Sequence, residues 1–186
     1  ISPDEPLTWD EFKDIAEQLT VTDDRGRITR AGFHFMGVTR HLYEIMMLQK
    51  GMNWIDSTGT EILWNSPEGV ETAQFLTSFV DDGIESADLP TFVEAFGSEL
   101  AAVVPASGWF KAAVIASYPD MEGKIGVAPL PTWDGDRLPA QTNGNQLVSL
   151  VVPSGLDDPT TTAAFEFVKF TLADNDMMHQ WLSVEN

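Results

Sequence analysis

The stretch Ala102-Val103-Val104-Pro105-Ala106-Ser107-Gly108-Trp109-Phe110 has the pattern of a strand that ends in a tight turn and passes into a helix. An apolar run comes first, small residues follow, and an aromatic residue stands at the start of a helix expected to reach about Tyr118. In open α/β sheets, ligands bind beyond the carboxyl ends of the strands. Gly108 and Trp109 are therefore candidate ligand-binding residues, unless Trp109 simply packs between helix and sheet.

Helices and strands alternate on both sides of this stretch. The capping box of Thr8 and Glu11 predicts where the first helix begins, and Ser66 with Pro67 predicts the start of the third. The connections are mostly short, so the alternation predicts an α/β architecture with a largely parallel sheet. Helices are expected at 8–19, 39–50, 66–82, 91–98, 108–118, 158–172 and 175–183, and strands at 31–38, 101–104, 124–128 and 146–152.

The proline-rich segment 129–142 is the best candidate for a crossover between domains, and at its end a polar tract leads into the apolar run 146–152. The tract contains Asn143, Gly144 and Asn145. The amide side chains donate and accept hydrogen bonds at once, which suits sugar hydroxyls, and Gly144 lets the backbone approach closely. The tract is thus either a second group of ligand-binding residues or an ordinary polar turn.

A third candidate group follows the expected strand at 31–38. Thr39, Arg40 and His41 stand at the N-terminus of the next helix. They face a ligand in the same strand-end crevice, or Thr39 caps the helix while Arg40 and His41 contact solvent. The pattern leaves both interpretations open.

Composition excludes several classes of function. With 29 acidic and 10 basic residues the net charge is −19, which argues against a nucleic-acid partner. The absence of cysteine removes disulfides, thiolate nucleophiles and zinc–thiolate sites together. No apolar run approaches the roughly 20 residues needed to span a bilayer.

No catalytic motif is present. His34, His41 and His179 do not pair at the spacing of a helical metal site, and no nucleophile elbow, P-loop or dinucleotide fingerprint occurs. Glu94 and Glu99 are close in sequence, which keeps open a hydrolase that acts on carbohydrate with a pair of carboxylates. Among so many acidic residues, such pairs also arise by chance. We expect no metal, no cofactor and no enzymatic activity.

Several segments together carry a family resemblance through their order and spacing. They are Pro6-Leu7-Thr8-Trp9-Asp10-Glu11-Phe12, Trp64-Asn65-Ser66-Pro67-Glu68-Gly69-Val70, Ser107-Gly108-Trp109, Gly123-Lys124-Ile125-Gly126-Val127-Ala128-Pro129-Leu130-Pro131 and Ala163-Ala164-Phe165-Glu166-Phe167-Val168-Lys169-Phe170. In this order they resemble the extracellular solute-binding proteins of ABC importers, within the sugar-binding family that includes maltose-binding protein.

The resemblance implies a periplasmic-binding-protein-like fold of two α/β lobes that close on a ligand by a hinge. Residues 1–142 would form most of the second, C-terminal lobe. Residues 143–186 would supply a crossover strand and helices of the first lobe, whose N-terminal portion is absent. The stacking aromatic of the family falls on Trp109, and its Gly-Gly loop falls on Asn143 and Gly144.

The implied function is capture of a sugar or similar polar solute in the cleft between the lobes, followed by delivery to membrane permease subunits. The implied location is periplasmic or extracellular, with membrane contact only through the permease or a lipid anchor outside this chain. A non-sugar solute remains an alternative. The acidic charge favours cations and Arg40 favours carboxylates, so these two features do not decide between ligands.

Overall fold

The computed structural model describes residues 7–135 and 151–173 of the 186-residue chain. The chain divides into two compact units, Ile1–Asn143 and Gly144–Asn186. The expected helix at 175–183 lies outside the described residues, as do residues 146–150 of the expected strand at 146–152. None of the described helices is long and apolar enough to cross a bilayer.

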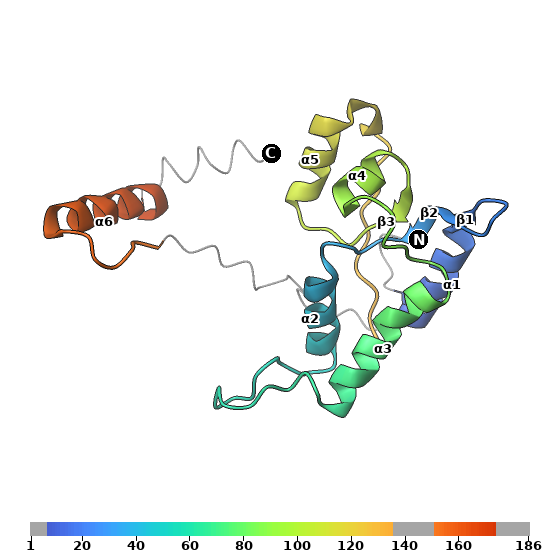
Figure 1. Cartoon of the computed structure of the whole chain (residues 1–186), viewed down its shortest axis with the longest axis horizontal. Coiled ribbons are helices and arrows are strands. Elements are labelled where there is room, and N and C mark those ends of the chain that lie inside the picture. Colours follow the sequence, from blue (N-terminus) through green and yellow to red (C-terminus); the bar gives the residue numbers. More distant parts are fainter. Residues whose placement is uncertain (1–6, 136–150, 174–186) are drawn as a thin grey trace. The chain divides into compact units, whose positions relative to one another are not determined.

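The first unit is built on a three-stranded sheet in the order β1-β2-β3 (Figure 1). β1 (Val21–Thr22) pairs antiparallel with β2 (Ile28–Phe33), and β2 pairs parallel with β3 (Ala101–Val103). The expectation of a largely parallel sheet is therefore wrong for the described residues. The two-residue β1 is too short to leave a sequence pattern, and it returns directly into β2 through a turn at Gly26, whose φ is +75°.

β2 ends earlier than the sequence pattern predicts. The expected strand at 31–38 ends at Phe33. The N–H of Phe35 donates to Oε2 of Glu85 at 2.7 Å, so a side chain replaces the next strand as its partner. The N–H of His34 still donates to the carbonyl oxygen of Val103 at 2.9 Å, so the backbone bonding to β3 ends one residue past Phe33 although the alternation of small and aromatic residues continues.

Helices surround this sheet, and their starts agree with the sequence signals. Thr8 Oγ1 accepts the N–H of Glu11 at 3.2 Å while Glu11 Oε2 accepts the N–H of Thr8 at 2.9 Å, which confirms the capping box. Ser66 Oγ accepts the N–H of Gly69 at 3.1 Å, as expected. The elements are α1 (Trp9–Leu19), α2 (Thr39–Gln49), α3 (Pro67–Asp81), α4 (Phe92–Gly97), α5 (Trp109–Ser117) and the 3-10 helix η1 (Pro119–Met121).

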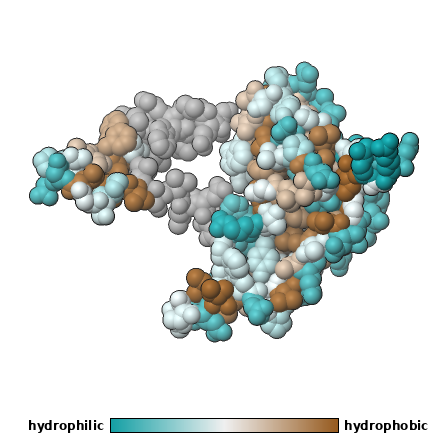
Figure 2. Space-filling model, viewed as in Figure 1, coloured by the Kyte–Doolittle hydropathy of each residue, from teal (hydrophilic) through white to brown (hydrophobic). Residues whose placement is uncertain are grey.

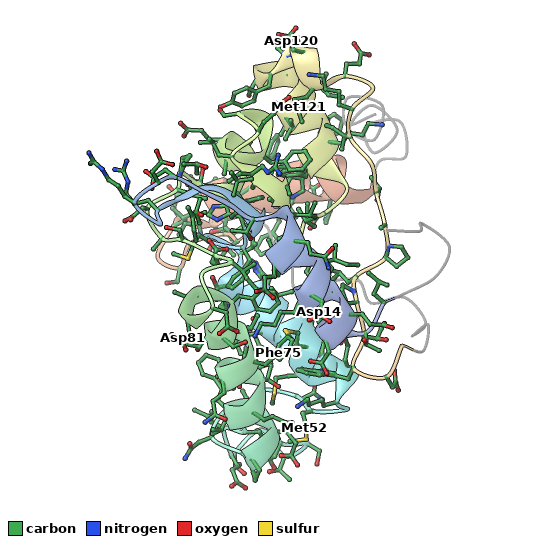
Figure 3. The ribbon with its side chains drawn as sticks, turned by 90° about the vertical axis from the view of Figure 1, so that its right-hand side faces the viewer. Asp14, Met52, Phe75, Asp81, Asp120 and Met121 are labelled. Carbon is green, nitrogen blue, oxygen red and sulfur yellow. The ribbon has the colours of Figure 1, made fainter. Side chains whose placement is uncertain are left out.

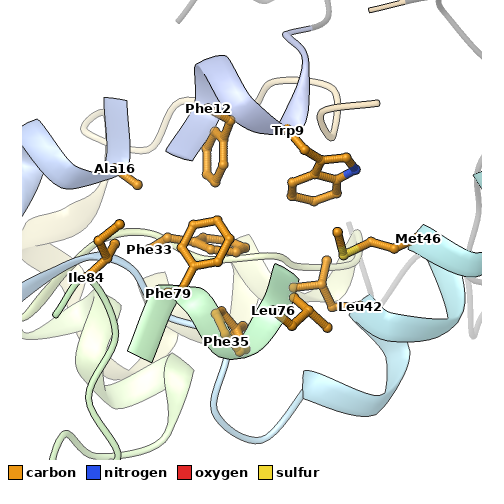
Figure 4. Packing of buried hydrophobic residues seen from close by; sticks show 10 residues of the cluster. All are labelled: Trp9, Phe12, Ala16, Phe33, Phe35, Leu42, Met46, Leu76, Phe79 and Ile84. Carbon is orange, nitrogen blue, oxygen red and sulfur yellow. The ribbon is translucent and has the colours of Figure 1, made fainter. Parts of the chain in front are cut away.

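The core of the first unit lies where α1 and α3 pack against β2. We call its ten buried members, shown in Figure 4, the core cluster: Trp9, Phe12, Ala16, Phe33, Phe35, Leu42, Met46, Leu76, Phe79 and Ile84. A Cβ at Gly32 would lie 1.7 Å from the carbonyl oxygen of Ala16, so α1 crosses β2 where no side chain fits. Each fully buried large side chain contributes roughly 1.5–3 kcal/mol to the free energy of unfolding.

The buried face of α3 differs from the expected one. Leu76 and Phe79 are buried as predicted, but Val70 and Ala73 are exposed and Thr72 is buried. The Thr72 hydroxyl donates to the carbonyl oxygen of Glu68 at 2.7 Å, so it is satisfied inside its own helix. A hydroxyl that is paired in this way is tolerated in the interior.

Phe75 marks the side of α3 that faces α1 (Figure 3). Its ring centroid is 6.4 Å from that of Trp9, and the ammonium of Lys13 lies 5.8 Å from the Phe75 centroid. Lys13 also pairs with Asp82 at 2.6 Å. The two helices are therefore joined by aromatic contacts inside and by a charged side chain at the edge.

The expected strand at 124–128 is wrong. The segment forms no strand, and its Val127 side chain is 76% exposed. A cavity of about 550 Å³ separates it from β3, the edge strand of the sheet, and is lined by residues 102–106 and 124–131 among others. The segment has the composition of a strand, but without a neighbour at hydrogen-bonding distance it cannot form a ladder.

The described part of the second unit, residues 151–173, contains one helix, α6 (Asp158–Ala173), which begins at Asp158-Pro159 as expected. Asp157 Oδ1 accepts the N–H of Thr160 at 2.8 Å at its start. Figure 2 shows apolar residues at the surface of this helix, and Phe165, Phe167 and Phe170 are each at least half exposed. α6 therefore has apolar side chains on several sides.

Candidate functional site

The turn between β3 and α5 places Trp109 at the carboxyl end of the parallel strand pair. Gly108 precedes the helix, and no side chain caps the helix start. Within the first turn, the N–H of Phe110 donates to the carbonyl oxygen of Ser107 at 3.0 Å, so the backbone rather than a side chain closes the helix start. The side chain of Trp109 is 44% exposed, which shows that it is not a core residue.

Two phenylalanines support the Trp109 ring. Its centroid is 6.1 Å from that of Phe92 and 6.1 Å from that of Phe110, and both contacts are edge-to-face. Phe92 and Phe110 stack nearly parallel with centroids 5.5 Å apart. We call these three residues the aromatic platform. Because Phe110 is buried and Trp109 is not, the platform holds part of the indole and leaves the rest accessible.

Thr39, Arg40 and His41 begin α2, which follows β2. Val38 is the N-cap residue and no side chain caps the helix, so the alternative in which Thr39 caps it is wrong. Thr39 lies one residue inside the helix, and its hydroxyl donates to the carbonyl oxygen of Phe35 at 3.2 Å. Arg40 is exposed, and its Nη2 lies 3.1 Å from Nε2 of the half-buried His41.

Arg40 faces a second aromatic pair in the loop between α2 and α3. Its guanidinium carbon is 5.3 Å from the centroid of Trp54, and the centroids of Trp54 and Trp64 are 5.2 Å apart. A guanidinium over an aromatic face is attracted by the ring quadrupole. This contact turns Arg40 toward the loop.

Asp56 orders the tip of the same loop. Its carboxylate accepts the hydroxyl and the N–H of Thr58 and the N–H groups of Thr60 and Glu61. These hydrogen bonds, above all that from the Thr58 hydroxyl, hold the pKa of Asp56 well below its usual range. The loop that carries Trp54 and Trp64 is therefore closed by its own side chains.

The turn at Gly37, which follows the end of β2, lies against Phe92 of the aromatic platform. Gly37 has φ +94°, and a Cβ there would lie 3.4 Å from the ring of Phe92. Phe92 therefore lies between the turn that leads into α2 and Trp109 on α5. The segments that follow β2 and β3 therefore both reach Phe92. Arg40, by contrast, points toward Trp54 rather than toward the platform.

The remaining candidates are three residues outside the described ranges and the carboxylates of Glu94 and Glu99. Asn143, Gly144 and Asn145 lie outside the described residues and stay predictions. Glu99 pairs with Lys124 at 3.4 Å, while Glu94 is exposed on α4. Within residues 7–135 and 151–173, no cluster of three or more His, Asp or Glu side chains is placed to hold a metal ion.

The arrangement suits binding by contact rather than bond-making. An exposed indole offers a flat apolar face, and Arg40 and His41 offer hydrogen-bond donors at the neighbouring strand end. The cavity of about 550 Å³ adjoins the platform at Phe110, but Trp109 is not among the residues that line it. Its lining is mainly aliphatic and aromatic, which suits a polyol poorly.

Sequence reasoning missed Phe92, Trp54 and Trp64. Phe92 opens a six-residue helix that was expected, but nothing local indicates that its ring supports Trp109. Trp54 and Trp64 flank the turn 56–59 in the sequence. In the structure their rings contact each other across this turn, beside the antiparallel bridge between Ile55 and Ile62. The contact between Arg40 and Trp54 depends on where that loop folds back.

Comparison with known proteins gives a consistent result. The family model for bacterial extracellular solute-binding proteins matches residues 1–177. The arabinooligosaccharide-binding protein of Bacillus subtilis (strain 168) is 27% identical over 151 residues, which is 74% of this chain and 32% of that protein.

Two solved structures share the fold. An ABC transporter solute-binding protein from Thermotoga lettingae, bound with α-D-tagatose, has a TM-score of 0.69 at 19% identity over 99% of this chain and 46% of its own. The maltose/maltodextrin-binding domain MalE from Bdellovibrio bacteriovorus, bound to maltotriose, has a TM-score of 0.64 at 18% identity over 92% and 44%.

The chain thus spans about a third to a half of the length of these relatives. The expected periplasmic-binding-protein-like α/β fold is confirmed, and the chain covers part of it. With the family model matching nearly all of its length, the chain belongs to the bacterial extracellular solute-binding protein family.

Proposed function

We propose that the protein is the substrate-binding component of an ABC transporter, which captures a sugar against Trp109 and delivers it to membrane permease subunits. The observation that carries the proposal is the aromatic platform, in which Trp109 is 44% exposed and rests on Phe92 and Phe110. A sugar ring has an apolar C–H face that lies flat on an indole. Such a contact is worth about 1–3 kcal/mol.

The relatives support a saccharide as the ligand class. One is named for binding an arabino-oligosaccharide, and two were solved with tagatose and maltotriose. These ligands differ in ring type and length, but all are polyols with apolar ring faces. The relatives are binding proteins, so we assign the protein capture without chemistry and without a cofactor.

The ligand site extends beyond the platform in this proposal. Residues 1–142 form most of the second lobe, and 143–186 contribute a crossover strand and helices to the first; the division of the chain near residue 143 supports this assignment. Both walls of a cleft are needed to desolvate a sugar. The further ligand-binding residues that we propose are Gly108, Thr39, Arg40, His41, Asn143, Gly144 and Asn145.

The family supports a location outside the cytoplasm. The protein then works in the periplasm or at the outer cell surface, where a lipid anchor outside residues 1–186 would hold it near the permease. A net charge of −19 suits this setting because it keeps the protein soluble and away from nucleic acid.

Calorimetric titration of the protein with tagatose, maltotriose and an arabino-oligosaccharide tests the proposal, with free amino acids and polyamines as the other ligand classes. We expect a saccharide to bind. Trp109→Ala should weaken that binding about 10- to 100-fold, since each factor of ten corresponds to about 1.4 kcal/mol.

Trp109→Phe is the matched control, because it keeps an aromatic face at the same position and should retain much of the affinity. Phe165→Ala, which removes an exposed aromatic side chain in α6, should leave affinity unchanged. An affinity within twofold of the starting protein after Trp109→Ala would refute the stacking role. Tight binding of an amino acid or polyamine and of no saccharide would refute the ligand class.

A further inference from the structure

His34 and Glu85 form a fully buried pair that the binding site described above does not use. Both side chains are 0% exposed, and His34 Nδ1 lies 2.6 Å from Glu85 Oε1. The second ring nitrogen, Nε2, lies 2.8 Å from the carbonyl oxygen of Pro90. Glu85 also accepts the N–H of Phe35 at 2.7 Å and that of Ser86 at 2.8 Å.

The partners of the ring determine its charge. Nδ1 faces a carboxylate and Nε2 faces a carbonyl oxygen, and both are acceptors, so each nitrogen must carry a proton. Protonated at both nitrogens, the His34 ring is an imidazolium that donates to Glu85 and to the carbonyl oxygen of Pro90. Burial alone lowers the pKa of His34, but the hydrogen bond and charge of Glu85 outweigh it, so that pKa is raised above 6.5.

Other charged groups near this part of the fold are directed elsewhere. In the loop after α3, Asp88 is exposed, and so is Glu94 on α4. At the start of α2, Arg40 approaches Glu44 at 3.6 Å. Among the described residues, Glu85 is the one charged group that acts on His34.

The pair is connected to the platform by a short path. His34 holds the carbonyl oxygen of Pro90, Thr91 follows as the N-cap of α4, and Phe92 is the first residue of that helix. Phe92 then contacts Trp109 with centroids 6.1 Å apart. Pro90, which His34 holds, is therefore two residues away from the ring that supports the indole.

We propose that His34 and Glu85 are positioning residues for Trp109: the buried ion pair ties the loop at residues 84–90 to the end of β2 and so holds Phe92 against the indole. Loss of the Nε2 proton would leave a ring nitrogen and a carbonyl oxygen facing each other as two acceptors, without a hydrogen bond. The loop then loses its tie, and the platform shifts as the pH rises through the pKa of His34. The positioning does not depend on the proposed function; only its effect on affinity does.

The sign of the pH dependence follows from the raised pKa. The pair contributes its full stability below pH 6.5, and the contribution is lost as the pH rises through the higher pKa of the folded state. The platform should therefore be intact in acid and altered in alkali. A histidine whose pKa was lowered by burial would give the opposite order.

The test is ¹⁹F NMR of the whole protein labelled with 5-fluorotryptophan. The chain has six tryptophans, and Trp109→Phe identifies the Trp109 signal by its disappearance. Between about pH 6 and pH 10, the Trp109 signal should titrate with a midpoint above 6.5. His34→Gln and Glu85→Gln should each abolish this titration and move the signal at neutral pH.

His41→Gln is the matched control, because it removes a histidine close in sequence to the Gly37 turn but not in the buried pair; the titration of Trp109 should persist in it. A Trp109 signal that stays flat over the whole range would overturn the proposal, and so would a titration that disappears in His41→Gln. Whether the Trp109 signal titrates or stays flat is measured in the unsubstituted protein, so this part of the test does not depend on any variant being folded.

Calorimetry with a saccharide separates this inference from the proposed function. A Trp109 signal that titrates in a protein that binds no saccharide supports the positioning and refutes the function. If the protein binds a saccharide through Trp109 but the Trp109 signal does not titrate, the function is supported and the positioning is refuted. If the positioning and the function are both correct, saccharide affinity should fall at least severalfold as the pH rises through the midpoint of the Trp109 titration. In His34→Gln the affinity should not show this fall.

Discussion

The core cluster and the aromatic platform are built from the same contacts but serve different ends. In the core cluster Phe12, Phe33 and Phe79 meet edge-to-face with centroids 4.8 and 5.4 Å apart; in the platform the distances are 5.5 to 6.1 Å. The exposure differs, since Phe33 is 1% exposed and Trp109 is 44% exposed.

The difference shows what decides the role of an aromatic residue here. The core cluster lies between α1, β2 and α3, so its rings are covered on all sides. The platform lies where β3 ends and α5 begins, and one member, Trp109, remains 44% exposed. Ring chemistry is the same in both places, and the position relative to the strand ends decides between stability and binding.

The largest expected effect comes from breaking the core cluster. Phe33→Ala should lower the free energy of unfolding by about 3–5 kcal/mol, because it removes a fully buried ring and leaves a cavity. Trp109→Ala should lower it by less than about 1 kcal/mol, since much of that ring already contacts water. Urea denaturation of the two variants measures both values. Similar losses in the two would mean that Trp109 is a core residue.

A smaller effect is expected where the core cluster begins along the chain. Thr8→Ala removes the cap of α1 and should cost about 1 kcal/mol of unfolding free energy, because the N–H of Glu11 loses its acceptor. Thr8→Ser keeps the hydroxyl oxygen and should restore most of the loss. α5 has no such side-chain cap, so no comparable substitution exists at the platform. Thermal unfolding with equal losses in both variants would contradict the capping role.

The smallest effect is expected at Gly108, beside Trp109. A Cβ there meets nothing within 4 Å, so Gly108→Ala should change the free energy of unfolding by less than about 0.5 kcal/mol. At Gly32, beneath the core cluster, Gly32→Ala places a Cβ 1.7 Å from a carbonyl oxygen and should be strongly destabilising. If Gly108→Ala leaves stability unchanged but weakens saccharide binding, the ligand approaches this backbone closely. A destabilisation as large as that of Gly32→Ala would show that the space is filled.

Much of the secondary structure could be predicted because its signals are local. The capping box at Thr8, Ser66 before Pro67, and Asp158-Pro159 each mark a helix start that the structure confirms. These signals depend on hydrogen bonds between residues two to four positions apart, so no distant segment can change them. Trp109 was placed correctly at the start of a helix for the same reason.

Errors occurred where a distant partner decides the outcome. The pairing of β2 with β3 does not continue beyond His34 because Glu85, about 50 positions further along, takes the N–H of Phe35. Segment 124–128 has the composition of a strand but has no neighbour to pair with among the described residues. The third helix buries Thr72 instead of Ala73, since the angle at which it packs on the sheet selects the face.

The amino-acid sequence by itself determined the helix starts, the aromatic residue at the end of a strand, the absence of cysteine chemistry and the acidic charge. Only the tertiary structure decided that Trp109 is partly exposed, that Phe92 and Phe110 support it, and that His34 and Glu85 meet 51 positions apart in a buried pair. The physical reason is range. Capping and turn formation depend on neighbours in sequence, whereas exposure and ion pairing depend on which elements pack together after the chain has folded.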